Sequence, residues 1–242
     1  MQWLFVRFAD WGWIETFTRG TREGEPVVTG IPMLIVWALV LVVIFLGRFV
    51  PVWTTPYMFA EGRAQGGVSY EWVALDDVAP VMARSVVAAE DANFCLHWGF
   101  DMAAIRQALE EGGTRGASTL SQQVVKNLYL WHGRSYPRKA LEALLTPVME
   151  ALWPKRRIVE VYLNIAEFDT GVFGVKAAAR HYFGVAPADL SATQAARLAA
   201  ILPDPKGRSA SKPSAFVQRR ARAIADGAAT IRRDGRAACF ES

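Results

Sequence analysis

The sequence predicts a mainly α-helical domain attached to a membrane by one N-terminal transmembrane helix. Three observations lead to this fold class: one long apolar run near the N-terminus, a succession of helical patterns after it, and no long alternation of apolar and polar residues. The 242 residues are enough for one domain and an anchor. Hydrophobic residues make up 52% of the chain, which excludes a disordered protein.

The anchor is predicted at residues 31–50. No charged residue occurs from Pro26 to Gly47, and a helix needs about 20 apolar residues to cross the hydrocarbon core of a bilayer. A soluble core helix would carry polar residues on one face, which this run lacks from Ile31 onward. A cleaved signal peptide is the alternative, although no small-residue cleavage site closes the run.

The segments that flank the anchor are an N-terminal arm at residues 1–30 and a linker at residues 51–70. Aromatic residues crowd the arm and suit a membrane interface, but a tail that merely carries tryptophans is an equal alternative. Proline and glycine punctuate the linker. Arginines lie on both sides of the anchor, so charge does not decide its orientation.

Helical patterns follow one another through the domain, which is predicted at residues 71–242. Caps at Asp76, Asp101 and Ser118 predict the starts of three helices. Pro137 fits the first turn of a fourth helix, which Pro147 is expected to kink. The predicted core stripe of that fourth helix is Leu141, Leu144, Leu145, Val148 and Leu152.

Three further helices complete the predicted domain. One starts at Pro154, and the next follows a capping box of Ser191 and Gln194. The last spans about residues 213–233 and is expected to bury its apolar side chains, Phe216, Ile224 and Ile231.

Two glutamates are candidates for acid–base chemistry. Glu90 ends a helix of small residues and is followed by Asp91; apolar neighbours and a second acid both raise a carboxyl pKa, as a general base requires. Glu142 lies at the margin of the leucine stripe, one turn after Arg138, where a helix can line a cleft. The plain alternatives are a solvated helix end for Glu90 and a surface ion pair for Glu142.

The segment between the two glutamates has the character of an anion site. A Gly–Ala–Ser–Thr entry into a helix presents free backbone N–H groups, and Gln122, Gln123 and Lys126 add donors along the next turns. From residue 115 to residue 157, basic residues outnumber acidic ones by eight to two. Phosphate binding explains this charge; a capped helix end with a solvated face, or a patch against anionic headgroups, is the alternative.

Several other site classes are excluded or left open. Three scattered histidines and two cysteines give no metal-site spacing, and no nucleic-acid motif occurs. The spacing of Cys95 and Cys239 does not tell whether they pair.

Four segments resemble, in order, the motifs of the family 51 glycosyltransferases, which polymerise peptidoglycan. They are AEDANFCLHWGFD (89–101), GASTLSQQVVKNL (116–128), RKALE (138–142) and KRRIVEVYLNIAEF (155–168). The resemblance extends over about residues 76–205 and departs from the common pattern at Ala117 and Ser121, both conservative changes. No transpeptidase segment follows, so we expect a monofunctional enzyme.

The resemblance implies a lysozyme-like helical glycosyltransferase domain with a smaller jaw partly sunk in the membrane. In this sequence Glu90 matches the family's catalytic base and Glu142 its second essential glutamate. Ser118, Gln123, Lys126 and Arg134 match positions that hold the diphosphate of the donor, and Lys155 matches a further basic position.

The resemblance also implies the substrates and the setting. The substrates are lipid II and the growing glycan chain, joined with inversion and with release of undecaprenyl diphosphate at the outer face of a bacterial inner membrane. No resident cofactor is expected; a divalent cation, Mg²⁺ or Mn²⁺, is allowed at the diphosphate. The expected partners are the membrane and proteins of cell division or wall synthesis, with no nucleic acid.

Two rival functions are weighed against this one. A glycan-cleaving enzyme shares the helical fold and the lone glutamate, but it gains little from a cationic cleft because its leaving group is uncharged. A non-enzymatic membrane scaffold would tolerate the loss of both glutamates.

Overall fold

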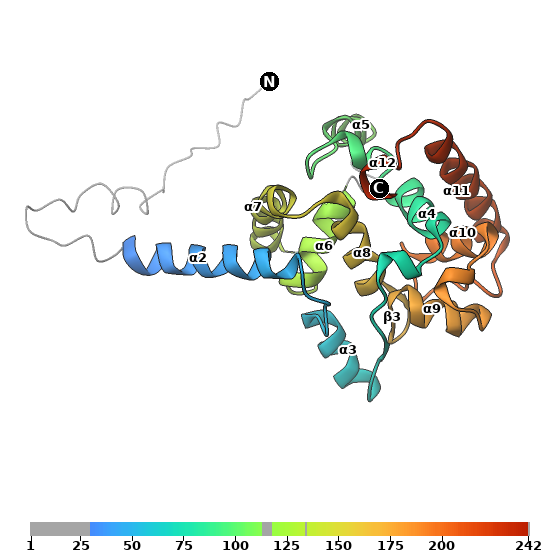
Figure 1. Cartoon of the computed structure of the whole chain (residues 1–242), viewed down its shortest axis with the longest axis horizontal. Helices are drawn as coiled ribbons and strands as arrows, with labels where there is room; N and C mark the ends of the chain where they lie inside the picture. The colour runs from blue at the N-terminus through green and yellow to red at the C-terminus, as the bar shows by residue number, and fades with distance from the viewer. Residues whose placement is uncertain (1–29, 113–117, 134, 242) are drawn as a thin grey trace, which may run out of the picture. The chain divides into compact units, whose positions relative to one another are not determined.

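The structure is a computed structural model that describes residues 30–112, 118–133 and 135–241 (Figure 1). It divides into two units, Met1–Val42 and Val43–Ser242, and the predicted arm lies almost wholly outside the described residues. The described helices are α2 (Gly30–Gly47), α3 (Pro56–Gln65), α4 (Pro80–Glu90), α5 (Met102–Glu110), α6 (Leu120–Tyr129), α7 (Tyr136–Leu152), α8 (Lys155–Ile165), α9 (Gly174–Phe183), α10 (Ala192–Ile201), α11 (Ala215–Arg233) and α12 (Ala238–Glu241). The mainly helical class is confirmed.

One small sheet was not predicted from the sequence. Its strands are β1 (Ser69–Tyr70), β2 (Glu167–Asp169) and β3 (Val172–Phe173), in the order β1-β3-β2. β3 pairs with β1 in parallel and with β2 antiparallel. Strands of two or three residues are too short to show an alternating pattern, which is why the sequence does not reveal them.

Helix α3 occupies residues 56–65 of the segment that the sequence assigns to the linker, where no helix was predicted. Thr55 caps the helix by accepting a hydrogen bond from the Met58 N–H at 3.1 Å, and Pro56 occupies its first turn. Gly66 ends it with a φ of 77°, a left-handed conformation that glycine adopts freely. Met58 and Glu61 are buried, so the proline and glycine are helix boundaries here.

Some predicted helix starts are confirmed and others are wrong. Asp101 caps α5 by accepting from the Ala104 N–H at 2.9 Å, and the capping box of Ser191 and Gln194 is present. Asp76 lies in a 3-10 turn, η2 (Leu75–Asp77), and α4 begins only at Pro80.

The predicted cap at Ser118 is also wrong. The cap of α6 is the next residue, Thr119, which forms a capping box with Gln122. A Ser–Thr pair offers two adjacent caps, and residue spacing does not choose between them.

The buried face of α7 differs from the predicted leucine stripe. Leu141 and Leu144 are 39% and 47% exposed, whereas Leu145 and Met149 are buried. The other buried residues on this helix are polar: Arg138, Glu142, Thr146 and Glu150. Hydrophobicity alone therefore misplaces the face, because paired polar side chains fill part of the interior. Phe216 on α11 is likewise exposed, while Ile224 and Ile231 are buried as predicted.

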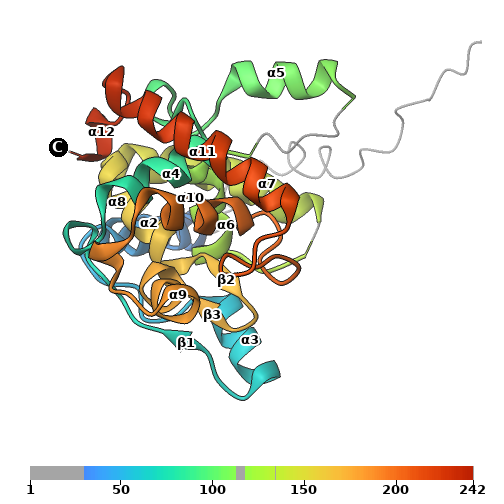
Figure 2. The same ribbon diagram turned by 90° about the vertical axis from the view of Figure 1, so that its right-hand side faces the viewer.

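Two groups of helices form the core. Helices α4, α10 and α11 pack together, and α6 packs against α7 and α8 (Figures 1 and 2). The C-terminal end of α4 meets the N-terminal end of α6, because the buried Asp91 side chain accepts from the Leu120 N–H at 2.9 Å. The ends of two core helices therefore position the first candidate glutamate.

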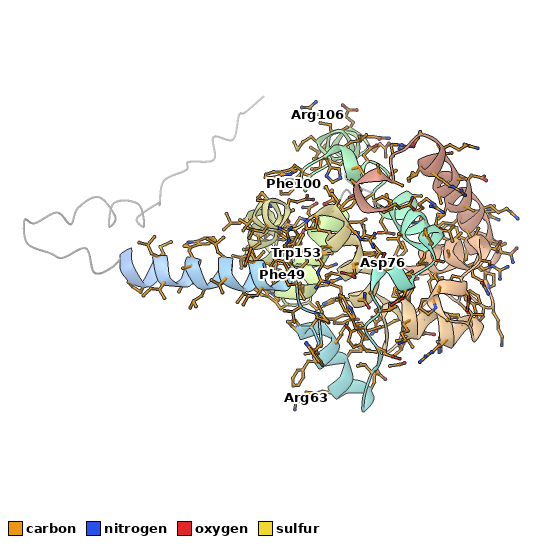
Figure 3. All side chains as sticks on the ribbon, viewed as in Figure 1. Phe49, Arg63, Asp76, Phe100, Arg106 and Trp153 are labelled. Atoms are coloured by element: carbon orange, nitrogen blue, oxygen red, sulfur yellow. A yellow bond between two sulfur atoms is a disulfide. The ribbon has the colours of Figure 1, made fainter. Side chains whose placement is uncertain are left out.

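The last turn of α2 and the residues after it are fixed to the α7–α8 junction. Trp153 lies at this junction and is labelled in Figure 3. Its Nε1–H donates to the Ile44 carbonyl at 2.7 Å, and Ile44 is 1% exposed. Arg157 donates to the carbonyl of Gly47, which the end of the helix leaves without a helical partner, and to the carbonyl of Val50 further along the chain. Within the described residues, none of the helices has both the length and the apolar character needed to span a membrane.

The two cysteines form a disulfide. Cys95 follows α4, in the 3-10 turn η3 (Phe94–Leu96), and Cys239 lies in α12. The sequence left this pairing open, because the two residues are 144 positions apart.

Candidate active site

Glu90, the last residue of α4, is nearly buried, with 14% of its side chain exposed. The Gln123 side chain donates to Glu90 Oε2 at 3.1 Å, and the Arg220 guanidinium lies 3.8 Å from Oε1. Oε1 has no hydrogen-bond partner among the described residues. One oxygen is therefore held by a hydrogen bond, and the other faces only the more distant Arg220 guanidinium among the described residues.

Burial raises the pKa of Glu90 above that of an ordinary glutamate. The loss of hydration is the main cause, and the Asp91 carboxylate adds to it. Gln123, Arg220 and Lys126 oppose the shift by stabilising the charged form. A carboxylate with a raised pKa is a stronger base than a solvated one, as general-base catalysis near neutral pH requires.

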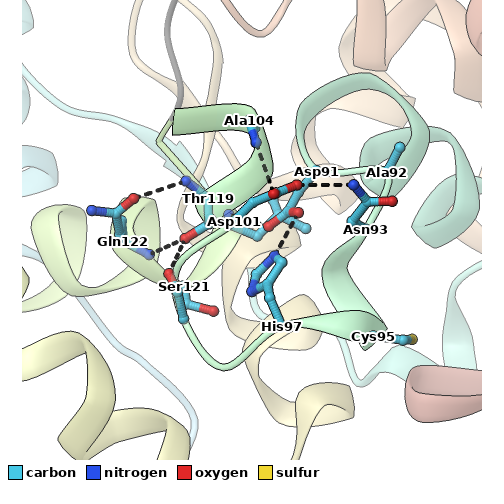
Figure 4. Close-up of polar contacts among 12 residues, drawn as sticks. Asp91, Ala92, Asn93, Cys95, His97, Asp101, Ala104, Thr119, Ser121 and Gln122 are labelled. Atoms are coloured by element: carbon cyan, nitrogen blue, oxygen red, sulfur yellow. Dashed lines mark hydrogen bonds and ion pairs between the residues drawn. The ribbon is translucent and has the colours of Figure 1, made fainter. Parts of the chain in front are cut away.

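Asp91 connects the C-terminal end of α4, where Glu90 lies, to the N-terminal end of α6. Its Oδ1 lies 2.8 Å from His97 Nε2 (Figure 4). Its Oδ2 accepts from the Leu120 N–H. Nearby, Thr119 donates to the Gly99 carbonyl at 2.6 Å. These contacts join the loop after Glu90 to the start of α6.

Glu142 is 3% exposed and is held by two cations. Arg138 donates to its Oε2 at 2.9 Å, and the Lys139 ammonium donates to its Oε1. The prediction that it lies on the margin between core and solvent is wrong, since it is buried, but the predicted pairing with Arg138 is confirmed. Lys139 also donates to Ser118 at 3.3 Å, so it connects Glu142 to the entry of α6.

Lys126 lies within electrostatic reach of both glutamates. Burial lowers the pKa of its ammonium, and Arg138 and Lys139 lower it further. Glu142 and Glu90 both act in the opposite direction. The side-chain ammonium of Lys126 makes no hydrogen bond with the described residues, so it is a partly desolvated cation with capacity for an anionic ligand. The half-buried Lys126 therefore interacts electrostatically with both glutamates.

A polar cavity of about 270 Å³ opens beside Glu90. Its lining includes Glu90, Asp91, Asp101, Ser118 and Thr119. A larger cavity of about 580 Å³ lies between α4, α11 and α12 and contains neither glutamate, so it is not the centre of this chemistry.

The remaining predicted diphosphate ligands are placed differently. Ser118 lines the cavity, but the amide of Gln123 is engaged by Glu90. Lys155 pairs with the buried Glu150 at 2.8 Å and lies over the Phe94 ring at 4.2 Å. Arg134 lies outside the described residues.

Sequence reasoning missed Arg220. It reaches Glu90 from α11, 130 positions further along the chain, and no local pattern near it predicts that contact. Arg220 Nε is itself buried without a hydrogen-bond partner among the described residues.

The described residues do not fit a metal ion held by protein ligands alone. No group of three or more His, Cys, Asp or Glu side chains comes together among them with metal-ligand geometry. Both oxygens of Glu142 are already used by Arg138 and Lys139. A cation at this site would need oxygens from its substrate as ligands.

Comparison with known proteins identifies the class. The chain belongs to the Transglycosylase family, which matches residues 60–229. Similar proteins are biosynthetic peptidoglycan transglycosylases from Jannaschia sp. (strain CCS1), 64% identical over 203 residues (84% of this chain, 85% of the relative), and from Caulobacter vibrioides, 46% identical over 202 residues (82% and 88%). A third, from Rhodospirillum centenum, is 47% identical over 225 residues (90% and 95%). The chain is a peptidoglycan glycosyltransferase of cell-wall biosynthesis, as its motifs predict.

Proposed function

We propose that this enzyme joins lipid II to a growing glycan chain with Glu90 as the general base. The 4-hydroxyl of the acceptor sugar attacks the anomeric carbon of the donor, and Glu90 Oε1 takes the hydroxyl proton. The bond between the anomeric carbon and the lipid diphosphate breaks, and the diphosphate leaves with the electron pair. Attack from the opposite face inverts the anomeric centre. The observation that carries this proposal is that Glu90, a nearly buried carboxylate with a raised pKa, lines a cavity, and one of its oxygens has no hydrogen-bond partner among the described residues.

Stabilisation of the departing diphosphate is assigned to cations. A diphosphate is already a good leaving group, so it needs positive charge more than a proton donor. Lys126 is the first candidate, because its ammonium is partly desolvated and makes no hydrogen bond with the described residues. Ser118 and Arg134 complete the proposed diphosphate site.

Glu142 is proposed to orient cations and not to transfer a proton. Its two oxygens hold Arg138 and Lys139, which in turn lie near Lys126. Gln123 is proposed to hold Glu90, and Lys155 stays a prediction as a diphosphate ligand. A divalent ion bound through the diphosphate also stays a prediction, and no step here depends on it.

We further propose that the enzyme works at the outer face of the inner membrane, anchored by the apolar residues around α2. Large apolar side chains of α2 such as Leu34 and Leu39 are 69% and 59% exposed, and an apolar surface of this kind needs a covering such as lipid. The Cys95–Cys239 disulfide supports an oxidising compartment. Lipid-linked substrates confined to the same bilayer would meet the cleft at a high local concentration.

The test offers the purified full-length protein two substrates separately, lipid II and finished glycan strands, and follows the products on a gel. The proposal predicts glycan strands and free undecaprenyl diphosphate from lipid II, and no shortening of finished glycan. Cleavage of finished glycan, the activity of a lysozyme-like enzyme, would contradict it. Inertness toward both substrates would favour a scaffold.

A further inference from the structure

The C-terminal end of the chain contacts the loop that follows Glu90. We call residues 236–241 the C-terminal clamp and residues 91–97 the catalytic loop. The Cys239–Cys95 disulfide joins the two covalently. The rings of Phe240 and Phe94, both fully buried, lie 6.5 Å apart.

A third contact reaches the loop close to Glu90. The Arg236 guanidinium donates to the Ala92 carbonyl at 3.2 Å. The clamp therefore contacts the catalytic loop at three points, and the nearest of them is two residues from Glu90.

The catalytic loop is in turn fixed at Asp91, the residue that follows Glu90. Asp91, its first residue, holds His97 at the end of the loop and the Leu120 N–H at the start of α6. The Phe94 N–H donates to the Asp91 carbonyl at 3.0 Å, so the ring that contacts the clamp is one hydrogen bond from this junction. A shift of Phe94 would thus reach both Glu90 and the first turn of α6.

The domain holds the clamp from its other side. Arg84 on α4 pairs with Glu241, and Arg156 on α8 donates to the Phe240 carbonyl at 3.2 Å. Helix α12 spans only Ala238–Glu241, and a helix of one turn is not stable by itself. Its position depends on these contacts and on the disulfide.

We propose that the Cys95–Cys239 disulfide and Phe240 are positioning residues for glycosyl transfer: they hold the catalytic loop, and through it Glu90, in the geometry that turnover requires. This proposal rests on the assignment of Glu90 as the base. It differs from a purely stabilising role, because it predicts altered catalysis in protein that is still folded.

The test compares the full-length enzyme before and after reduction with a phosphine, which breaks the S–S bond to two thiols and is itself oxidised to the phosphine oxide. Lipid II polymerisation is measured well below the lowest melting temperature in the set. We expect kcat to fall roughly 10-fold, since misplacing a catalytic group by about 1 Å can cost up to about 10²-fold. KM is expected to change little. The acid limb of the pH profile of kcat should also move to lower pH. A loosened loop admits water to Glu90, and hydration lowers the pKa that burial has raised.

Variants separate this effect from unspecific effects of the reductant. The C95A/C239A double variant should show the lowered kcat with or without phosphine. Phe240→Leu should lower kcat in the oxidised enzyme, whereas Phe216→Leu, at an exposed phenylalanine of α11, should not. Glu90→Gln is measured beside them to test the assignment of the base.

The outcomes distinguish the two proposals. An inactive Glu90→Gln variant together with unchanged kcat and unchanged acid limb after reduction overturns the positioning role and leaves the function intact. An active Glu90→Gln variant overturns both.

Discussion

Replacing Asp91 with alanine tests whether the junction between α4 and α6 is as tightly coupled as the structure indicates. The Asp91 side chain is 2% exposed and serves two partners, the Leu120 N–H at 2.9 Å and His97 Nε2 at 2.8 Å. Hydrogen bonds to a charged group contribute roughly 1.5–3 kcal/mol each, so losing both costs about 3 kcal/mol or more. For a domain of this size that lowers Tm by about 6–12 °C.

The assay is thermal unfolding of Asp91→Ala beside Asp76→Ala. The Asp76 side chain is 86% exposed and also loses one ion pair, with Arg156 at 2.6 Å. A surface substitution of this kind changes stability by about 0.5 kcal/mol or less. Equal melting temperatures for the two variants would refute the reasoning, because they would show that the buried carboxylate is no more important than an exposed one.

Three further predictions concern the charges of the site. The pKa of Glu90 is raised and that of Lys126 is lowered. In the pH profile of kcat, the acid limb and the basic limb should therefore both lie closer to neutral pH than those of an ordinary glutamate and an ordinary lysine. Limbs at the ordinary pKa values would contradict this prediction. Lys126→Gln should lower kcat/KM by about 10²-fold or more. Lys212→Gln, at an exposed lysine, is the control and should change kcat/KM little. Equal effects of the two substitutions would show that Lys126 is not part of the site. The fold favours the protonated form of Glu90, and this contribution to stability is lost as the pH rises through the raised pKa. The Tm gain of Glu90→Gln over the native enzyme should therefore be smallest in acid and grow with pH. A gain that does not depend on pH would refute this prediction.

Local sequence signals predicted the positions of the helices well, but they predicted less well which face of a helix is buried. The caps at Asp101 and Ser191 are local hydrogen bonds, and the structure confirms both. The buried face of α7 depends on partners elsewhere in the fold, because Glu142 is buried with Arg138 and Lys139 around it. A hydrophobic stripe alone does not reveal such a polar interior.

The candidate site was likewise predicted in part: its residues within the motifs were identified, and its contacts between distant segments were not. The resemblance of the motifs pointed to Glu90, Glu142 and Lys126, and in the structure Lys126 lies within electrostatic reach of both glutamates. Arg220 and the Cys95–Cys239 disulfide contribute through contacts between segments more than 100 positions apart. No pattern within a single segment carries that information.

The central claim is that Glu90 acts as the base of glycan polymerisation, and the Glu90→Gln variant tests it most directly. Lipid II binding and the release of undecaprenyl diphosphate are measured on one preparation of the folded variant. The account predicts binding close to that of the native enzyme and a turnover reduced by about 10²-fold to 10⁴-fold, the range for loss of a general base. Native-like release of undecaprenyl diphosphate by this variant would contradict the account.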